Sequence, residues 1–489
     1  MGYGKAAGLQ VFSFPGRSVL RAFAPLFLLA LLLPSPLLGD MPANSEQSSE
    51  QKPSEYRLTL NGFIEYEDFL STRTDQEPAD INKKSEFRGN LRLKYGRDRV
   101  FMYANANLYI APVFIDEDLN NEYIYSEGFE TGRNGRVSNR AFELEFRELY
   151  LNYGFGKYRL RAGNQIYGWG TADVFNPTSY FNPFDLREFL FRDEDELKKG
   201  VPSFSTMVFM DIFTVEMVVA PVHTPMTVAD VDNFWALKYR EGPFPVYVAG
   251  PEPLPVALEN VSLGARLSKS VSGVDVSFSL FHGPDRDPVF RPRRTVLAPS
   301  EPVSVEVVPE HLPSTSVGFD FSTDLGKFVI QGEAAYTPDK PGVVEQPYSI
   351  NTRFPFEVKR SHYISYSGGF NYFIPLNLLF ENHEGDTIFT FEWNQSRYFD
   401  NSLMAPLISD ILTARLQDSY FDSRLSVTFT LLMDVRNSGY LLWPVVEYDF
   451  QNGFKLSLAY GHIEGNDDTV FGYFRDNDII MLKARYVFQ

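Results

Sequence analysis

The stretch FRGNLRLKYG (residues 87–96), followed after a short polar turn by VFMYANANLY (residues 100–109), decides the fold. In both parts apolar residues, glycine or alanine occupy every second position, and polar or aromatic residues stand between them. A period of two is typical of a β-strand with one apolar and one polar face. The residues between the two parts, RDR, are too few for a crossover and suit an antiparallel turn. The stretch therefore predicts a β-hairpin.

The same alternation recurs from residue 56 to the end of the chain. The clear segments begin near residues 56, 86, 99, 141, 157, 203, 213, 258, 273, 314, 327, 362, 385, 424, 440, 454 and 478. A closed antiparallel barrel with both chain ends on one side needs an even number of strands. Leu403–Asp418 has apolar residues at alternate positions, with Asp410 as the flaw, so we predict a further strand there. The alternation also changes phase near Phe146–Arg147, which predicts a bulge.

Short and long connections alternate along the chain. Short turns lie at residues 95–98, 153–156, 270–273, 324–326 and 451–453, and long polar segments cover residues 71–85, 111–140, 222–257, 283–313, 338–361 and 463–477. Short periplasmic turns and long external loops are typical of an outer-membrane barrel, whereas alternation alone also fits a soluble sandwich. We therefore predict an all-β fold, a transmembrane antiparallel β-barrel of about eighteen strands, with sixteen as the alternative.

The composition excludes several classes of function. The chain has 489 residues, 45 Lys and Arg against 63 Asp and Glu, and no Cys. Without Cys there is no disulfide, thiolate zinc site, iron–sulfur cluster or cysteine nucleophile. A net charge of −18 argues against nucleic acid as a partner. An aromatic share of 15% with a mean hydropathy of −0.21 fits a wall in which only every second residue meets lipid.

No arrangement of residues predicts catalysis or a cofactor. Ser361, His362 and Ser365 offer a nucleophile and a base, but no residue at a fixed spacing completes a triad. No phosphate loop, dinucleotide fingerprint or zinc spacing is present. We expect a protein that is not an enzyme and that has no cofactor and no metal site.

The N-terminus predicts export. Three basic residues, Lys5, Arg17 and Arg21, precede an apolar run whose uninterrupted part, Leu26–Leu33, is far shorter than the roughly 20 residues of a membrane helix. This pattern predicts a cleaved signal peptide over residues 1–39.

The rest of the chain divides into two parts. Residues 40–55 are polar and low in complexity, and predict a flexible periplasmic tail. Residues 56–489 form the predicted barrel, which ends on ARYVFQ (residues 484–489), an alternating strand with an aromatic near its end. Such an end suits the barrel-assembly machinery, so we expect the bacterial outer membrane as the location.

The segment 158–202 is the most informative one. Its Asn-Pro pairs are helix N-cap signals, and the second pair predicts a short helix from Pro183 that buries Leu186, Phe189 and Leu190. In a wide barrel, residues 166–200 would fold inward as a constriction loop; the alternative is a lid over the rim of the barrel. The candidate constriction residues are Gln165, Trp169, Asp173, Asn176, Asn182, Asp185, Arg187 and Arg192.

Charged residues occupy many inward positions of the predicted strands. The candidate basic residues of the lumen are Arg57, Arg88, Arg92, Lys94, Arg159, Arg161, Lys483 and Arg485. The acidic ones are Asp320, Glu333, Glu447 and Asp449. A wall with a basic and an acidic side would set a transverse field that orders ions and polar solutes. The alternative is that these charges pair with one another or with the loop.

The motif G-x-Q-x-x-x-WG (residues 163–170), followed by NP (176–177) and NP-x-DLREF (182–189), resembles a group of Gram-negative outer-membrane porins related to alginate-export and other anion-selective porins. Weaker similarities lie in residues 263–283, 317–336 and 471–488. The resemblance implies a monomeric or trimeric channel. Acidic external loops and the terminal Gln489 depart from the pattern, and the loops put simple anion selectivity in doubt.

We therefore expect a porin for passive diffusion of small hydrophilic solutes, anions among them, through a pore that the loop narrows. The competing class is a structural barrel with a plugged lumen, an adhesin or a sheath for a periplasmic partner. The expected partners are outer-membrane lipids and lipopolysaccharide, the barrel-assembly machinery, the solutes themselves, and further copies of the chain in a homotrimer.

Overall fold

The computed structural model describes residues 56–73, 81–110, 130–132, 136–138, 142–173, 175–192, 194–229, 234–236, 246–250, 253–295, 304–346, 354–376, 387–404, 408–466 and 469–489. The chain divides into a unit of residues 1–54 and a unit of residues 55–489. The predicted signal peptide and flexible tail lie outside the described residues. No helix in the described ranges is both long and apolar enough to cross a membrane.

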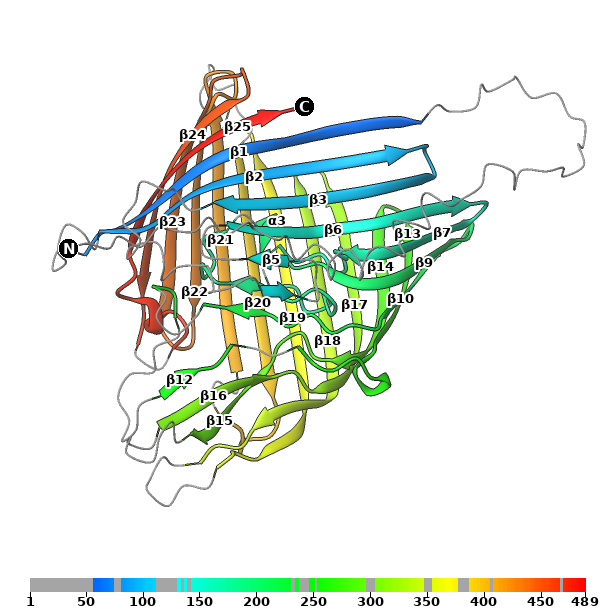
Figure 1. Cartoon of the computed structure of the whole chain (residues 1–489), viewed down its shortest axis with the longest axis vertical. Helices are drawn as coiled ribbons and strands as arrows, with labels where there is room; N and C mark the ends of the chain where they lie inside the picture. Colours follow the sequence, from blue (N-terminus) through cyan, green and yellow to red (C-terminus); the bar gives the residue numbers. More distant parts are fainter. Residues whose placement is uncertain are drawn as a thin grey trace, which may run out of the picture. The chain divides into compact units, whose positions relative to one another are not determined.

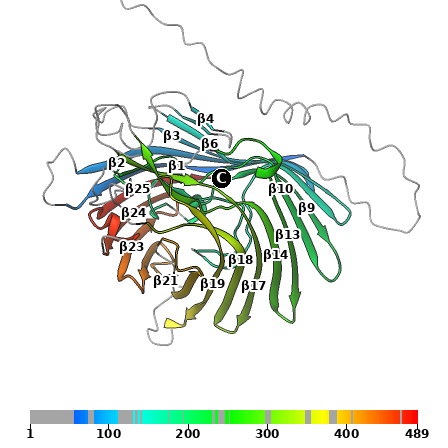
Figure 2. The ribbon, with the colours of Figure 1, turned by 90° about the horizontal axis from the view of Figure 1, so that it is seen from below.

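The second unit is a closed antiparallel β-barrel of eighteen strands (Figures 1 and 2). The strands are β1 (Arg57–Ser71), β2 (Asn82–Gly96), β3 (Val100–Ile110), β6 (Phe142–Phe155), β7 (Tyr158–Gln165), β9 (Val201–Phe209), β10 (Thr214–Ala220), β13 (Ser262–Val271), β14 (Val274–Pro284), β17 (Pro313–Leu325), β18 (Phe328–Val343), β19 (Val358–Ile374), β20 (Thr387–Tyr398), β21 (Ile408–Tyr420), β22 (Leu425–Asp434), β23 (Gly439–Asp449), β24 (Phe454–Glu464) and β25 (Ile479–Phe488).

Each of these strands pairs with the next one along the chain, and the last pairs with the first. In the closing pair of β1 and β25, Gly62 lies opposite Phe488 and Ser71 opposite Ile479. In Figure 1, β1, β2 and β3 run across the view while β19, β20 and β21 run along it. Strands tilted in a barrel wall cross those of the opposite wall in this way.

The predicted eighteen strands are confirmed, including the weakest one. β21 covers Ile408–Tyr420 and pairs with both of its neighbours, although it contains Asp410. The predicted bulge is present too. Along the pair of β3 and β6, Asn105 faces Glu148 and Ala106 faces Phe146, so Arg147 is left without an opposite residue.

Smaller elements belong to the long connections. They are β4 (Glu130–Gly132) and β5 (Arg136–Ser138), which extend the barrel sheet at β6; β8 (Asp185–Leu186), paired with β11 (Thr227–Val228); and a sheet of β12 (Val246–Val248), β15 (Val289–Thr295) and β16 (Ser304–Glu310). The helical pieces are α3 (Glu194–Leu197) and two 3₁₀ turns, Leu258–Asn260 and Gly472–Phe474. In Figure 1 the β12–β16–β15 sheet lies at the lower left, beside the lower ends of β18 and β19.

The barrel wall exposes its apolar face outward and buries its polar face. On β1, Ile64 is 58% exposed, whereas the next residue, Glu65, is 1% exposed. Phe204, Phe278 and Leu458 are also more than half exposed. This arrangement inverts the usual order of a soluble protein and is typical of a transmembrane β-barrel.

The helix predicted from Pro183 is wrong. Asp185 and Leu186 form the short strand β8, a turn follows over residues 187–190, and Phe189 has a φ of 54°, in the left-handed region. The only helix near this point in the described residues is α3, a single turn over Glu194–Leu197. The physical reason is that the Arg187 guanidinium donates to the Asp185 carboxylate, and residues two apart lie on different sides of a helix.

Candidate functional site

Residues 166–200, which connect β7 to β9, are here called the inner loop. Asn182 closes its base. The Asn182 side-chain amide donates to the carbonyl of Gln165 at 3.0 Å and to that of Lys199 at 2.7 Å, and its oxygen accepts from the N–H of Tyr167 at 2.7 Å. Gln165 in turn donates to Ser203 of β9. Two predicted residues, Gln165 and Asn182, thus hold together the strands from which the loop leaves and to which it returns.

The tip of the inner loop is bound by carboxylates of the wall. Glu333 of β18 accepts hydrogen bonds from the N–H of Ala172 at 2.8 Å and from the N–H and hydroxyl of Thr178 at 3.0 and 2.5 Å. Glu392 of β20 accepts from the N–H of Asp173 at 2.8 Å. A buried hydrogen bond of this kind contributes about 0.5–1.5 kcal/mol, so the four together hold the tip firmly to the wall.

An aromatic cluster packs the middle of the loop against β10, β13 and β14. The Trp169 indole N–H donates to Glu216 at 2.8 Å, and the Trp169 ring lies edge-on to Phe181, with centroids 5.3 Å apart. Phe181 also meets Phe281 of β14 edge-on. Gly264 makes room for this cluster, because a Cβ there would lie 2.6 Å from the Phe181 ring.

Asn176, another predicted residue, lies beside this cluster and is buried. Its side-chain amide makes a long contact of 3.4 Å with the carbonyl of Ala172. Gly170, at a φ of +89°, approaches it closely, and a Cβ at this position would lie only 2.1 Å from the Asn176 side-chain oxygen, far inside van der Waals contact. The Trp-Gly and Asn-Pro signals of the sequence therefore meet in space.

The second half of the inner loop is held by buried charges. Asp185 accepts from Arg187 at 2.6 Å and from Arg192 at 3.1 Å, and Arg187 also bonds Glu143 of β6 at 3.0 Å. Glu188 bonds Lys84 of β2 at 2.8 Å. These side chains are nearly inaccessible to water, so each charge depends on its partner.

The same network sets the charge state of Glu188. Burial raises the pKa of Glu188, but the adjacent charges of Lys84 and Arg192 outweigh burial and lower the pKa to about 2. Glu188 is therefore ionised at neutral pH and is a fixed member of the network. Elsewhere in the loop, burial and then the charge of Arg286 lower the pKa of Lys198 to about 8.

A third set of ion pairs joins the loop to the strands that close the barrel. Arg88 of β2 bonds both Glu196 of the loop and Glu65 of β1, the latter at 2.5 Å. Arg485 of β25 bonds Glu65 at 2.5 Å, and Lys483 bonds Glu67 at 3.2 Å. For these basic residues the pairing alternative holds, because acids of the wall and loop neutralise them.

The contacts of the inner loop reach strands on all sides of the barrel: β2, β6, β10, β13, β18, β20 and, through Phe191, β24. The contacting wall residues are on the buried, inward face. A loop that only covered the rim could not reach all of them, so the inner loop crosses the interior of the barrel.

Five of the predicted basic residues have no ion pair within the described part of the chain. They are Arg57, Arg92, Lys94, Arg159 and Arg161. Three of them lie over aromatic rings instead: Lys94 is 4.3 Å from the centroid of Phe101, Arg159 5.0 Å from that of Phe209, and Arg161 5.1 Å from that of Tyr150. All five lie on β1, β2 and β7, in the half of the barrel nearer the short turns.

The acidic residues have structural partners. Asp320 bonds Arg266 of β13 at 2.8 Å, and Glu333 holds the loop tip. Glu447 and Asp449 both bond Lys455. The predicted acidic residues of the wall therefore have partners, whereas five of the predicted basic residues have no ion pair among the described residues.

Sequence reasoning missed the wall residues that receive the loop. They are the acids Glu143, Glu216 and Glu392 and the glycines Gly264 and Gly461. The two partners of Arg88, Glu65 of the wall and Glu196 of the loop, were missed as well. Glycine at inward positions of otherwise alternating strands was the one signal that could have located the aromatic contacts.

In the part of the chain that the structure describes, neither a metal site nor a catalytic site stands out. No group of three or more His, Asp or Glu side chains suited to a metal occurs among the described residues. Ser361 and His362, adjacent on β19, face opposite sides of the wall: Ser361 is buried, whereas the exposed His362 ring accepts from or donates to the Tyr336 hydroxyl at 2.8 Å.

Comparison with known proteins adds the following. A family model described as a protein of unknown function (DUF1302) matches residues 46–203, less than half of the chain. No curated protein matches the sequence. Among solved structures, the chain is similar to OccAB1 of Acinetobacter baumannii, with a TM-score of 0.47 and 9% identity over 90% of this chain and 99% of that one. It is also similar to a BenF-like porin from Pseudomonas fluorescens Pf-5, with a TM-score of 0.48 and 8% identity over 89% and 98% of the two chains.

A third similar structure is OmpT of Vibrio cholerae lacking loop L8, an outer membrane protein, with a TM-score of 0.40 and 10% identity over 88% of this chain and 99% of that one. None of these findings concerns alginate export, so that part of the resemblance stays a prediction.

Proposed function

We propose that this protein is an outer-membrane porin through which small hydrophilic solutes, anions in particular, diffuse passively. The observation that carries the proposal is the set of five unpaired cations, Arg57, Arg92, Lys94, Arg159 and Arg161, on the inward face of a barrel whose outside is apolar. A lumen lined by Arg and Lys favours anions, as rings of these residues do in anion pores.

The inner loop narrows this pathway in our proposal. It crosses the interior and is bound to the wall by buried ion pairs, by carboxylates at its tip and by aromatic rings. Trp169, Asp173, Asp185, Arg187 and Arg192 would then fix the shape of the constriction. The charges of Asp185, Arg187 and Arg192 are neutralised by partners, so in our proposal ion selection falls mainly to the unpaired cations on the short-turn side of the loop.

Arg159 and Arg161 are the best residues for a test, because they lie on one strand and bond no carboxylate within the described residues. The experiment measures the reversal potential of the reconstituted protein in a KCl gradient across a planar bilayer. We expect an anion-selective potential for the wild type and a shift toward the cation value for Arg159→Gln/Arg161→Gln.

A matched control removes a cation from the outer face. Lys269 of β13 is exposed. Because Arg266 and Ser268 of the same strand point inward, the alternation of side chains places Lys269 on the outward face. Lys269→Gln is expected to leave the reversal potential unchanged. An unchanged potential in the Arg159/Arg161 variant would remove these residues from the filter.

A structural barrel with a plugged lumen is the second candidate. It is favoured by the depth to which the loop is buried: Thr178 and Asn182 are 0% exposed. In this case the intact protein would conduct no ions, whatever its charges, and the loop would serve stability. Conductance therefore separates the two candidates before selectivity is measured.

The remaining features of the proposal follow from export and membrane insertion. A signal peptide over residues 1–39 would direct the chain to the periplasm. The strand β25, which ends on Phe488, would then be presented to the barrel-assembly machinery. Assembly into a homotrimer also belongs to the proposal.

A further inference from the structure

The outer wall of the barrel is interrupted by a groove over β17–β20. Two outward glycines lie opposite each other there, Gly332 of β18 and Gly368 of β19. In the same cross-strand row, Phe321 lies opposite Gly332 and Trp393 opposite Gly368. The groove has a volume of about 500 Å³, and Phe370 and Phe391 also line it.

Gly368 leaves open space in the groove. A Cβ added at this position would have no heavy atom within 4 Å, and the residue does not need the left-handed backbone region that favours glycine. The stacked rings of Phe370 and Phe391, with centroids 5.7 Å apart, form one side of the groove. A shallow apolar depression on a lipid-facing wall, walled by aromatic rings, suits a hydrocarbon chain.

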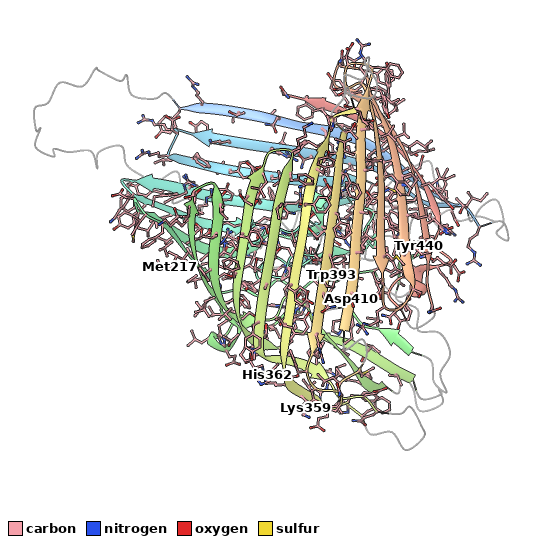
Figure 3. All side chains as sticks on the ribbon, turned by 180° about the vertical axis from the view of Figure 1, so that it is seen from behind. Met217, Lys359, His362, Trp393, Asp410 and Tyr440 are labelled. Atoms are coloured by element: carbon pink, nitrogen blue, oxygen red, sulfur yellow. The ribbon has the colours of Figure 1, made fainter. Side chains whose placement is uncertain are left out.

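A polar cluster adjoins the groove on the side of the long loops. Asp410 of β21 accepts from the Trp393 indole at 3.2 Å, from Gln395 at 2.6 Å and from Arg436 at 3.2 Å. The hydroxyl of Tyr366 donates to Gln395, which completes the cluster. Figure 3 shows Trp393 and Asp410 next to each other on the wall, with His362 and Lys359 farther toward the loop end.

The cluster presents positive charge to the surroundings of the barrel. The Arg436 side chain is 49% exposed although it bonds Asp410, which is itself nearly buried. Arg397, two residues beyond Gln395 on the same outward face of β20, is exposed and has no ion pair within the described residues. It lies over the ring of Phe399, 5.2 Å from its centroid. Two cations therefore stand at the loop end of an apolar groove.

We propose that this groove and cluster bind a phosphate-bearing lipid of the outer leaflet, of the lipopolysaccharide class. One acyl chain would lie over Gly368, beside the Phe321 ring that covers Gly332, and a phosphate would contact Arg397 and Arg436. Arginine is suited to this role, because its planar guanidinium matches phosphate oxygens in pairs. Trp393 and Tyr366 have the amphipathic rings that favour the interface between headgroups and acyl chains.

The charge of the cluster distinguishes this occupant from a second copy of the chain. A second barrel would bring another apolar wall to the groove, and it would leave Arg397 without a counter-charge in the described region. A lipid with a phosphate satisfies both the apolar depression and the cations. We therefore assign the site to a lipid. The experiment below would also detect self-association of the chain.

The experiment is native mass spectrometry of the full-length protein in detergent, titrated with lipid A, phosphatidylglycerol or phosphatidylcholine. We expect lipid A to bind most tightly and phosphatidylcholine least. Gly368→Leu places a side chain in the groove at a position where a Cβ meets no heavy atom within 4 Å, and Arg397→Gln/Arg436→Gln removes the cations. Each variant is expected to weaken lipid A binding by about tenfold or more, which corresponds to about 1.4 kcal/mol.

Gly89→Leu is the matched control. Gly89 also lies at an outward position, on β2, and a Cβ there would likewise have no heavy atom within 4 Å. This variant is expected to bind lipid A like the wild type. Equal binding of all three lipids, or unchanged binding by Gly368→Leu, would overturn the proposal. Oligomers without lipid that disappear in Gly368→Leu would overturn it in favour of self-association.

The inference does not depend on solute transport. Gly368 and Arg397 are on the outward face, so their replacement is expected to leave the conductance and the reversal potential unchanged. A barrel that binds lipid A but conducts no ions would support this inference and contradict the proposed function. A barrel that conducts ions but does not bind lipid A would support the proposed function and contradict this inference.

Discussion

The ring of Phe191, in the inner loop, lies directly against Gly461 of β24: a Cβ at residue 461 would be 2.4 Å from the Cε1 atom of the phenylalanine. Phe191 is 1% exposed, and its ring meets that of Trp443 edge-on at 5.3 Å. This contact fixes the loop to β24, which lies four strands along the wall from β20, the strand of Glu392, and six from β18, the strand of Glu333. Residue 461 must remain glycine for the loop to keep its path.

Gly461→Val is therefore expected to displace Phe191. Overpacking a well-packed site costs about 1–3 kcal/mol, and the loop loses its anchor on β24. We expect a folded barrel with a larger single-channel conductance than the wild type. Gly89→Val, in open space on β2, should leave conductance unchanged. A wild-type conductance for Gly461→Val would show that this anchor does not hold the constriction.

Arg88 is expected to be important for stability. It is buried between Glu65 and Glu196, and removing one partner of a buried ion pair costs about 3–5 kcal/mol. Arg88→Gln should thus lower the urea concentration at the midpoint of unfolding. Unfolding can be measured by the heat-modifiable migration of the barrel in a gel. Arg57→Gln, at an exposed position with no ion pair in the described residues, provides the control and should unfold like the wild type. Equal midpoints for both variants would mean that the network contributes little.

The contact between His223 and His311, which lie outside the barrel strands, is expected to be sensitive to acid. Their buried rings lie 4.5 Å apart. Burial lowers the pKa of both imidazoles. For His223, burial and then the neighbouring His311 lower the pKa from 6.5 to about 3. The folded pKa lies below the unfolded one, so stability is complete above pH 6.5 and is lost as the pH falls toward 3.

The loss is about 1.4 kcal/mol per pH unit within this range. Hydrogen exchange of residues 221–226 and 311–313, corrected for intrinsic rates, should show easier opening at pH 4.5 than at pH 7. The variant His223→Gln/His311→Gln should lack this dependence. Protection that does not change between the two pH values in the wild type would contradict the assignment.

The alternation of side chains was sufficient to predict every strand of the barrel, because outward positions must be apolar and a period of two follows directly. Even β21 could be placed, since the even strand number required it. Asp410, its apparent flaw, accepts from Trp393, Gln395 and Arg436. A carboxylate at an outward position is thus tolerated when neighbouring strands supply its donors.

The path of the inner loop could not be predicted in the same way. The Asn-Pro signal at residue 182 is local, and it predicted a helix. In the structure, Asn182 instead closes the base of the loop, and Asp185 accepts from two arginines, so tertiary contacts decide the backbone. The same holds for the charges of the wall: whether Arg88 or Arg161 has a partner depends on where the acids of the loop come to lie.

Single-channel conductance of the intact protein, compared with a variant that lacks residues 168–198, tests the central claim most directly. We expect discrete conductance steps from the intact protein and larger steps from the deletion, because in our proposal the loop narrows but does not close the pathway. The absence of steps from both proteins would contradict passive transport. Steps only after the deletion would identify the intact protein as a plugged barrel.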